Sequence, residues 1–235
     1  MAINQKWKDT MLMAIKDAKW DAYDVTIKAQ VALYEKKFPA LKDKVNWLLI
    51  KAMVWTESGG VSSASWATRV IQIGNAGDPA YAVLKKGSEG SELIMSDALK
   101  KSLTEKSIDD AQLNIEAGIA YLYTRMAKSL FQSIRDAKDG KVYEYVVLPG
   151  DNLDKIANKV GTTLEEIKKQ NPAASGIIQP KMKLKYIKAK TTRVITGWYD
   201  FTADTIAERY NGGGDANYAE KLKFILSDVI PHLKR

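Results

Sequence analysis

Residues 45–60 constrain the fold of this chain more than any other stretch. Their sequence, VNWLLIKAMVWTESGG, is apolar on nearly every side when drawn as a helix. A helix that is apolar all round belongs in the middle of a domain. The stretch becomes polar at Thr56, Glu57 and Ser58, and two glycines then end it. The pattern predicts a buried central helix with one carboxylate at its C-terminal end.

Glu57 stands where its pKa is expected to rise. Burial penalises the ionised carboxylate, and the negative end of the helix dipole acts in the same direction. A carboxyl group that stays protonated near neutral pH can serve as a general acid. On this stretch alone, a solvated glutamate at the end of a core helix is the simpler interpretation.

Composition removes several classes of catalytic site. The 235-residue chain has no cysteine, which excludes disulfides, thiolate nucleophiles and zinc–thiolate sites. Its single histidine, His232, is predicted to lie on the surface, and one histidine argues against histidine-dependent triads and multi-histidine metal sites. We therefore expect no metal and no cofactor. Acid–base chemistry would fall to carboxylates, tyrosine or lysine.

The formal charge of +8 predicts attraction to anionic partners such as nucleic acid, anionic membranes or bacterial cell wall. The lysines are spread along the chain without a basic–aromatic motif, so nucleic acid is not the expected partner. No stretch is long enough for membrane insertion, and the N-terminal residues lack the pattern of a signal peptide. We expect a protein made in the cytoplasm that stays there or leaves by another route.

Apolar periodicity predicts helices over most of the chain. The expected ranges are 1–20, 24–37, 45–60, 91–105, 109–131 and 217–230. After Thr191 helix is also expected to return, with Thr202 or Asp204 opening a helix that runs to Tyr210. In the second helix, the inward residues are predicted to be Val25, Ala29, Ala32 and Leu33. Residues 143–188 differ, because β-rich segments at 143–148 and 184–187 enclose two shorter helices. Asp151 and Thr163 are the expected N-caps of those helices, with Glu166 completing a capping box.

This strand–helix–helix–strand segment resembles the LysM domain. The matching stretches are YEYVVLPGDNLDKIANKVGTTLEEIKKQNP and IIQPKMKLKYI, in the order and spacing of that family. The resemblance implies a small α+β (βααβ) domain that binds glycans containing N-acetylglucosamine, such as peptidoglycan and chitin. The glycan-binding residues that it implies are Gly150, Asp151, Asn152, Pro172, Ile177 and Ile178. The family usually has a glycine where this chain has Lys181.

The rest of the sequence resembles the catalytic domain of lytic transglycosylases and goose-type lysozymes. Four short motifs carry the resemblance: Glu57-Ser58-Gly59, Ile71-Gln72-Ile73, a helix with Asn114, Ala117, Gly118, Tyr121 and Leu122, and Tyr210-Asn211 before glycines. It implies a mainly α, lysozyme-like catalytic domain in two parts, residues 1–140 and 191–235. The LysM domain, residues 141–190, would be inserted between them. The loop from Glu57 to Gln72 is shorter than usual, and Arg69-Val70 replaces the usual Gly-Leu.

The second resemblance implies cleavage of the β-1,4 bond between N-acetylmuramic acid and N-acetylglucosamine. Glu57 would protonate the glycosidic oxygen and then accept the proton of the muramic acid 6-hydroxyl, giving a 1,6-anhydro product. A substrate-contacting serine is expected among Ser62, Ser63 and Ser65. The substrate-binding residues that it implies are Ser58, Ser65, Gln72, Ile73, Tyr121, Tyr210 and Asn211.

Two other functions fit the same residues. A hydrolytic muramidase would need a second carboxylate at a fixed distance from the first. The candidates are Asp78, Glu116, Asp200 and Asp215. A non-catalytic cell-wall-binding protein would use the LysM segment alone, although the glutamate at the motif position argues against it.

Peptidoglycan glycan strands are the expected partner in each case. A wall-cutting enzyme without a signal peptide resembles a phage lysin released by a holin, or an antibacterial effector exported by a type VI secretion system. Either would act in the periplasm or the cell wall. An immunity protein or the secretion apparatus would then be a further partner.

Overall fold

The computed structural model describes residues 2–174 and 177–233. Over these residues the protein is mainly helical, with one two-stranded sheet made of β1 and β4 and another made of β2 and β3. The chain divides into two compact units. The helical unit comprises the residues up to 128 and those from 195 onward, and the inserted unit comprises residues 129–194. The expected division had its boundaries after residues 140 and 190.

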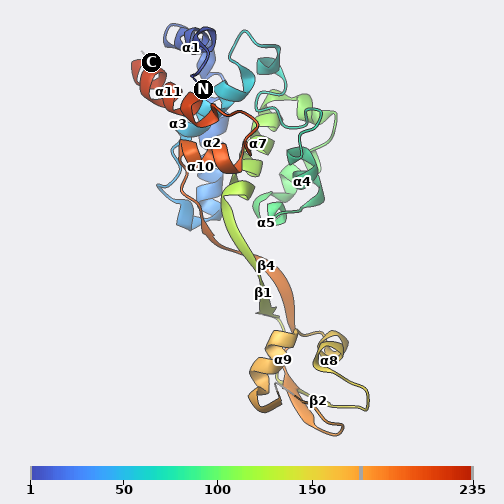
Figure 1. Ribbon diagram of the computed structural model, residues 1–235. Coiled ribbons are helices and arrows are strands. Elements are labelled where there is room, and N and C mark those ends of the chain that lie inside the picture. Colours follow the sequence, from blue (N-terminus) through green and yellow to red (C-terminus); the bar gives the residue numbers. More distant parts are fainter. Residues whose placement is uncertain (1, 175–176, 234–235) are drawn as a thin grey trace. The chain divides into compact units, whose positions relative to one another are not determined.

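The helical unit is formed by two separate parts of the chain (Figure 1). Its helices and helical turns in the first part are α1 (Gln5–Leu12), η1 (Met13–Ile15), η2 (Ala18–Asp21), α2 (Asp24–Lys37), η3 (Pro39–Leu41), α3 (Trp47–Ser58), η4 (Ala64–Ala67), α4 (Ala80–Lys86), α5 (Ser91–Ile94), α6 (Asp97–Ser102), η5 (Ser107–Asp109) and α7 (Ala111–Met126). Those in the second part are α10 (Ala203–Arg209), α11 (Tyr218–Phe224), η7 (Ile225–Val229) and η8 (Ile230–His232). The strands β1 (Ala127–Arg135) and β4 (Ala189–Trp198) each cross the boundary between the units.

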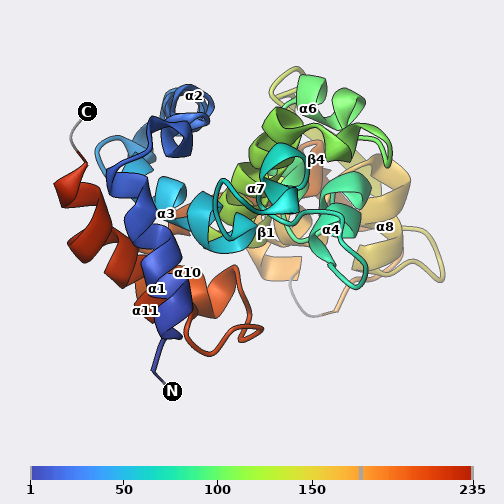
Figure 2. The same ribbon diagram turned by 90° about the horizontal axis from the view of Figure 1, so that it is seen from above.

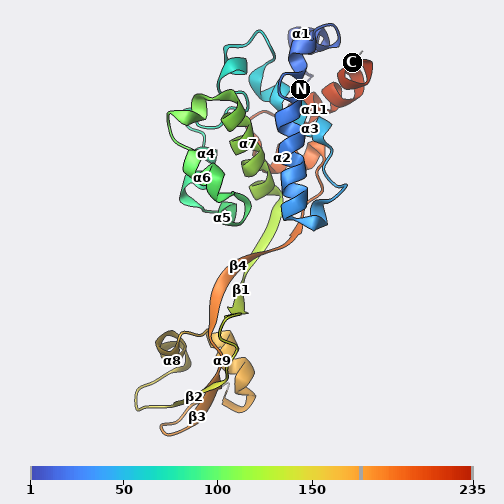
Figure 3. The same cartoon turned by 180° about the vertical axis from the view of Figure 1, so that it is seen from behind.

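Helix α3 is the buried centre of the helical unit, as its sequence predicts. Every residue from Leu49 to Trp55 is buried. Helix α2 packs against both α3 and α7, and this arrangement is visible in Figure 3. The one charged residue of the buried stretch is Lys51, whose Nζ lies 2.5 Å from Asp21 Oδ1 and 2.9 Å from Asp24 Oδ2. These two carboxylates compensate the charge that α3 carries into the core.

Helix α2 has the predicted ends, but its predicted buried face is wrong. Val25 is 81% exposed and Leu33 is 44% exposed, whereas Ile27, Val31 and Tyr34 are buried. The buried set also follows helical spacing, so the sequence offers two apolar faces. Tertiary packing selects one of them, because the Tyr34 ring stacks on Tyr123 at 4.2 Å between centroids.

Three other predicted helices are wrong in extent. The N-terminal stretch forms α1 followed by 3₁₀ turns, and the 91–105 stretch forms two short helices, the second capped by Ser96. The predicted helix at 109–131 ends at Met126, and β1 begins at the next residue. Strand β1 pairs with β4, which also occupies residues where helix was expected to return. Local periodicity could not reveal this pairing, because the two strands are far apart in sequence.

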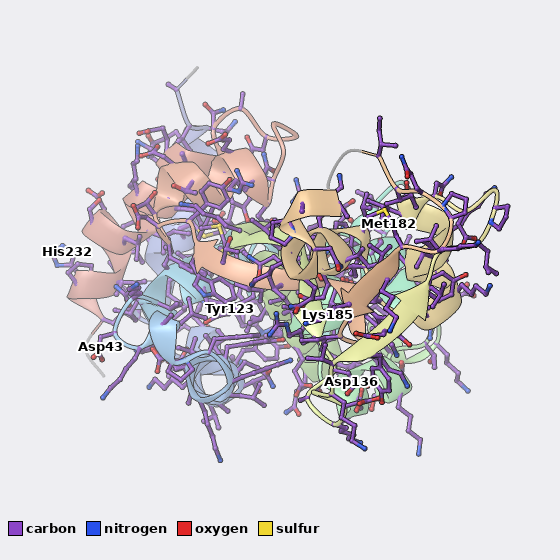
Figure 4. The ribbon with its side chains drawn as sticks, turned by 90° about the horizontal axis from the view of Figure 1, so that it is seen from below. Asp43, Tyr123, Asp136, Met182, Lys185 and His232 are labelled. Atoms are coloured by element: carbon purple, nitrogen blue, oxygen red, sulfur yellow. The ribbon has the colours of Figure 1, made fainter. Side chains whose placement is uncertain are left out.

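The two terminal regions of the described helical unit lie side by side, with α1 next to α11 (Figure 2). The rings of Trp7 and Phe224 join them, 6.1 Å apart between centroids. His232 is exposed, as predicted, at the edge of the helical unit in Figure 4. No helix of the described ranges is long and apolar enough to cross a bilayer.

The inserted unit contains the predicted βααβ fold. Its elements are β2 (Tyr143–Val146), α8 (Leu153–Val160), α9 (Leu164–Gln170), η6 (Pro172–Ala174) and β3 (Lys183–Tyr186). Strands β2 and β3 are antiparallel, with Tyr143 opposite Tyr186 and Val146 opposite Lys183. Figure 4 labels Lys185 on β3. The small core of this unit consists of Val147, Ile156, Ala157, Ile167, Ala174 and Leu184.

The helix caps of the inserted unit differ in part from the prediction. Asn152, not Asp151, caps α8 by accepting a hydrogen bond from the Lys155 N–H at 2.8 Å. Thr163 caps α9 as predicted, accepting from the Glu166 N–H at 3.1 Å. The Glu166 carboxylate does not complete the capping box, because it pairs with Arg135 at 2.7 Å.

Lys181, which replaces the usual glycine, takes a backbone conformation that favours glycine. Its φ is +72°, and its N–H donates to the Val147 carbonyl at 2.8 Å. Because a non-glycine residue costs about 1 kcal/mol in this region, Lys181→Gly should stabilise the inserted unit by about that amount. Tryptophan fluorescence does not report on this unit, because all tryptophans lie outside it. The measurement is therefore hydrogen exchange at the Val147 amide, which should be slower in Lys181→Gly.

Lys183→Gly is the matched control, because it removes the same side chain from strand β3. Glycine inside a strand is expected to destabilise the unit by roughly 0.5–1 kcal/mol. Faster exchange in both variants would contradict the assignment of strain to Lys181.

Candidate functional site

Glu57 lies in the last turn of α3, half-buried, with a tyrosine hydroxyl beside it. The Tyr218 O–H donates a hydrogen bond to Glu57 Oε1 at 2.6 Å. Burial raises the pKa of Glu57 to about 7, and the charges of Asp78 and Asp215 act in the same direction. The Tyr218 hydrogen bond and the Lys221 charge oppose this rise in pKa. Near neutral pH this carboxyl can therefore both donate and accept a proton.

A cavity of about 200 Å³ opens beside Glu57. Its lining comes from α3, from residues 71–78, from α7 and from the end of α10. The lining residues are Glu57, Ile71, Gln72, Ile73, Asn75, Asp78, Tyr121, Tyr210 and Asn211. The structure thus brings together six predicted site residues from four distant stretches: Glu57, Gln72, Ile73, Tyr121, Tyr210 and Asn211.

The Ile71–Ile73 segment is fixed to α7 by Asn114, which is fully buried. Asn114 Oδ1 accepts from the Ile71 N–H at 2.9 Å, and its Nδ2 donates to the Ile73 carbonyl at 2.9 Å. Between these anchors Gln72 has φ +64°, a conformation that non-glycine residues rarely adopt. Strain of this kind persists where the surroundings over-determine it, often at functional sites.

Gly118 permits the close approach of this segment to α7. A Cβ atom at Gly118 would lie 2.1 Å from Ile71 Cγ2, which no real packing allows. The motif residues on α7 therefore have a structural purpose. Asn114 bonds the backbone on either side of Gln72, and Gly118 leaves space for the Ile71 side chain.

Tyr210 lines the same cavity and directly follows the end of α10. Its ring meets Tyr121 edge-on, 5.6 Å between centroids, and its O–H points to the Ile71 carbonyl at 3.4 Å. Burial raises the pKa of Tyr210 well above its usual value, and the Glu57 charge adds to the effect. Tyr210 therefore stays a protonated hydrogen-bond donor.

Two arginines hold Tyr210 in place from outside the cavity. Arg125 Nε donates to the Arg209 carbonyl at 2.8 Å, and Arg209 Nε donates to the Arg125 carbonyl at 2.9 Å. This reciprocal pair joins the end of α10 to the end of α7, immediately before Tyr210.

The two serines predicted to bind substrate are not among the cavity-lining residues. Ser58 is buried and bonds its own helix end, donating to the Val54 carbonyl at 2.7 Å and accepting from the Gly60 N–H at 3.1 Å. Ser65 lies in η4, where its N–H donates to Ser63 Oγ at 3.2 Å. Ser58 therefore serves to end α3.

Of the carboxylates considered for a second catalytic role, Asp78 lines the cavity. Its two oxygens accept from the Gly74 and Ala80 N–H groups, both at 2.9 Å. Asp215 lies near enough to influence Glu57 and pairs with Lys221 at 2.6 Å. Glu116 and Asp200 are not among the lining residues. In the described ranges, no group of His, Asp or Glu side chains is arranged to hold a metal ion.

Tyr218 is the site residue that the sequence reasoning missed. It is buried on α11, one helical turn before Leu222 on the inward face. Its position on the inward face of the predicted helix could have indicated a role, because a buried tyrosine needs a partner for its hydroxyl. The sequence alone did not reveal that this partner is Glu57.

Tyr218→Phe should raise the pKa of Glu57 above about 7, because the lost hydrogen bond favours the ionised carboxylate. The titration of a ¹³C-labelled glutamate side chain, followed by NMR, measures this directly. Tyr199→Phe removes a hydroxyl from the same unit and serves as the control. An unchanged or lower midpoint in Tyr218→Phe would show that the hydrogen bond does not stabilise the ionised form.

The predicted glycan-binding residues of the inserted unit flank two of its loops. Gly150 makes the first turn with φ +83°, and the side chains of Asp151 and Asn152 accept backbone hydrogen bonds there. Pro172 begins η6, Ile177 is 84% exposed, and Ile178 packs partly on the core. Thus Ile177 remains available to a ligand, whereas Asp151 and Asn152 also shape the loop.

Comparison with known proteins identifies one part of the chain. Residues 145–185 match the LysM domain family, and this match implies peptidoglycan binding. No curated protein and no solved structure matches the chain. The fold and the family match agree over the inserted unit, so this unit contains a LysM domain.

Proposed function

We propose that this protein cleaves the glycan strands of peptidoglycan, with Glu57 as both general acid and general base. The LysM domain accounts for binding to the wall. The observation that carries the catalytic proposal is one cavity in which a carboxyl of pKa about 7 meets Gln72, Tyr121 and Tyr210. A raised carboxyl pKa inside a cavity is a physical feature of general-acid sites.

In the first step, protonated Glu57 donates its proton to the oxygen that links muramic acid C1 to the next sugar. The C1–O bond breaks as this oxygen becomes a hydroxyl. In the second step, the Glu57 carboxylate accepts the proton of the muramic acid 6-hydroxyl, whose oxygen bonds to C1. The 1,6-anhydro ring closes, Glu57 regains its proton, and no outside water is consumed. A pKa near 7 suits a group that acts in both directions.

The other cavity residues would position the sugar. Gln72 is already oriented, because its Nε2 donates to the Arg69 carbonyl at 3.1 Å and its Oε1 accepts from Asn75. The rings of Tyr121 and Tyr210 provide an apolar wall for a sugar face, and Asn211 adds an amide. Tyr218 is a positioning residue, since its hydrogen bond fixes the Glu57 carboxylate.

Mass spectrometry of digested peptidoglycan tests this proposal. The expected products end in 1,6-anhydromuramic acid and are lighter by one water than hydrolysis products. Digestion in H₂¹⁸O adds a second criterion, because the anhydro products should carry no label. Soluble products with labelled reducing ends would establish hydrolysis instead. The absence of soluble products would favour a wall-binding protein without catalysis.

Hydrolysis is the second candidate, because Asp78 lines the same cavity as Glu57. A hydrolase would use this second carboxylate to activate water or to stabilise the sugar cation. Asp78→Asn distinguishes the two reactions. It should remove labelled products if Asp78 is catalytic, and it should leave anhydro products in the mixture if Glu57 acts alone.

We also propose that the protein acts in the periplasm or cell wall, as a phage-lysin-like enzyme or an antibacterial effector. The support is chemical: its substrate lies outside the cytoplasmic membrane. Bacteria that express the protein fused to an export signal should lyse, whereas expression without that signal should be tolerated. Equal toxicity from both forms would point to a cytoplasmic target.

A further inference from the structure

The inserted unit has a groove away from the two loops at which its glycan-binding residues were predicted. A cavity of about 570 Å³ lies between α8, the turn into α9 and the first residues of β4. A second cavity of about 450 Å³ extends it along β1, past Phe131. Both cavities have Thr163, Leu164 and Thr191 in their lining, so they adjoin at these residues, and together they are called the groove below. The volume of each cavity falls in the range of small-molecule sites.

Small residues make the floor of this groove. Ala157 and Ala189 are buried, and Gly161 ends α8 with φ +70° and open space at its missing Cβ. The Ala189 N–H donates to the Gly161 carbonyl at 3.3 Å, and Thr162 Oγ1 donates to the Ile187 carbonyl. These bonds fix the floor to β4 before any ligand arrives, so the groove is preformed.

Polar side chains line the walls, and several are available for binding. Asp154 and Asn158 lie one turn apart on α8, and Lys190 and Thr191 belong to the facing strand β4. All are exposed, and within the described part of the chain none has a side-chain hydrogen bond or ion pair. Their donors and acceptors are therefore free for a ligand that offers both kinds of group.

The apolar part of the lining narrows the choice of ligand. The Phe131 side chain is 62% exposed, with the Arg193 guanidinium 4.6 Å from its ring centroid. Leu164 lies where the two cavities meet. An exposed ring beside amide, hydroxyl and charged groups suits a sugar, whose C–H face packs on the ring while its hydroxyls bond the rim. The two carboxylates of the lining, Asp154 and Glu165, are matched by two lysines, Lys168 and Lys190, so the groove has no net charge that would attract a polyanion.

We propose that this groove is a second saccharide site of the LysM domain, which takes an oligosaccharide of N-acetylated hexoses. The amide of Asn158 and the hydroxyl of Thr191 would bond the acetamido group, and its methyl would contact Leu164. The inference rests on the wall-binding part of the proposed function and is independent of cleavage by Glu57. Two sites on one domain would let a single LysM unit hold a glycan mesh more tightly than one site could.

The test is an NMR titration of the ¹⁵N-labelled full chain carrying Glu57→Gln, with the tetrasaccharide of N-acetylglucosamine as probe. Backbone amides of Asn158, Gly161 and Thr191 should shift, separately from those of the predicted loops. Thr191→Trp, which fills the groove, should weaken these shifts by about tenfold or more in apparent affinity. Thr192→Trp is the matched control, because Thr192 is exposed on the same strand and is not among the groove-lining residues, so it should leave the groove response unchanged.

A tetrasaccharide of glucose, which lacks the acetamido group, should bind the groove about tenfold more weakly or worse. Groove amides that stay unmoved at saturating probe would overturn the proposal, as would a response that Thr191→Trp does not change. Equal binding of the two tetrasaccharides would overturn the assigned ligand class. None of these outcomes bears on product analysis of the unmodified chain, so a failure of this site is distinguishable from a failure of the cleavage proposal.

Discussion

Glu57→Gln is expected to reduce peptidoglycan cleavage by about 10²–10⁴-fold while the protein stays folded. The amide keeps the shape of the side chain and can still accept the Tyr218 hydrogen bond, but it has no proton to give to a leaving oxygen. The measurement is the release of soluble muropeptides, with circular dichroism as the check on folding.

Glu208→Gln is the matched control, since Glu208 is an exposed carboxylate on α10 and should leave activity unchanged. If Glu57→Gln releases muropeptides at a rate near that of the unmodified protein, Glu57 is not the acid. A loss of equal size in both variants would point to a general effect of charge.

The same carboxyl sets an expected dependence of stability on pH. The folded state raises the pKa of Glu57 from its ordinary 4.5 to about 7, so folding favours the protonated form. Below about pH 4.5 both states bind this proton, so the group gives the free energy of unfolding no dependence on pH. Between about pH 4.5 and about 7 only the folded state binds it, so the free energy of unfolding falls as pH rises through this interval. Relative to Glu57→Gln, the unmodified protein should lose stability over this window. Urea midpoints of both proteins at about pH 4 and about pH 8 measure the difference.

Asn114→Ala should have the largest effect on stability and should also impair the site. The variant leaves the Ile71 N–H and the carbonyls of Ile73 and Ile108 without their partner inside the core. Because each buried unsatisfied group costs about 1–3 kcal/mol, a loss of about 3 kcal/mol or more is expected. Urea denaturation followed by tryptophan fluorescence reports on the helical unit, which holds all the tryptophans.

Gln112→Ala controls for loss of an amide on the same helix, because Gln112 is exposed. Cleavage by Asn114→Ala, corrected for the folded fraction, should fall by about tenfold or more, since Gln72 is no longer held on both sides. Unchanged cleavage per folded molecule would mean that Asn114 stabilises the fold but does not position the site.

Much of the architecture could be predicted from local sequence. A helix that is apolar on all sides is expected to be buried, and α3 lies in the core as predicted. The caps, turns and alternation of residues 143–186 define a βααβ unit without tertiary information, because each element is short and its ends are marked by Gly161, Thr163 and Asn171.

The remaining features depend on contacts between distant residues. The buried face of α2 is chosen by the stacking of Tyr34 on Tyr123, although the alternative face has equal periodicity. Strand β1 has no strong alternation, and it is extended because β4 pairs with it. Tyr218 enters the site through one hydrogen bond from α11 to α3. No pattern within a single helix encodes any of these contacts.

The cavity beside Glu57 needs two parts of the chain that the inserted unit separates, which has a consequence for the order of folding. Helix α7 ends where β1 begins, and β4 leads into α10 and Tyr210. There is an entropic cost to bringing the ends of a long unstructured loop together before stabilising contacts have formed. A LysM unit that folds first, with β1 paired to β4, replaces that long loop by a short one. The reciprocal Arg125–Arg209 bonds can then form between neighbours. In kinetic terms, the insertion need not slow assembly of the site, provided that its own nucleus forms earlier than the helical one.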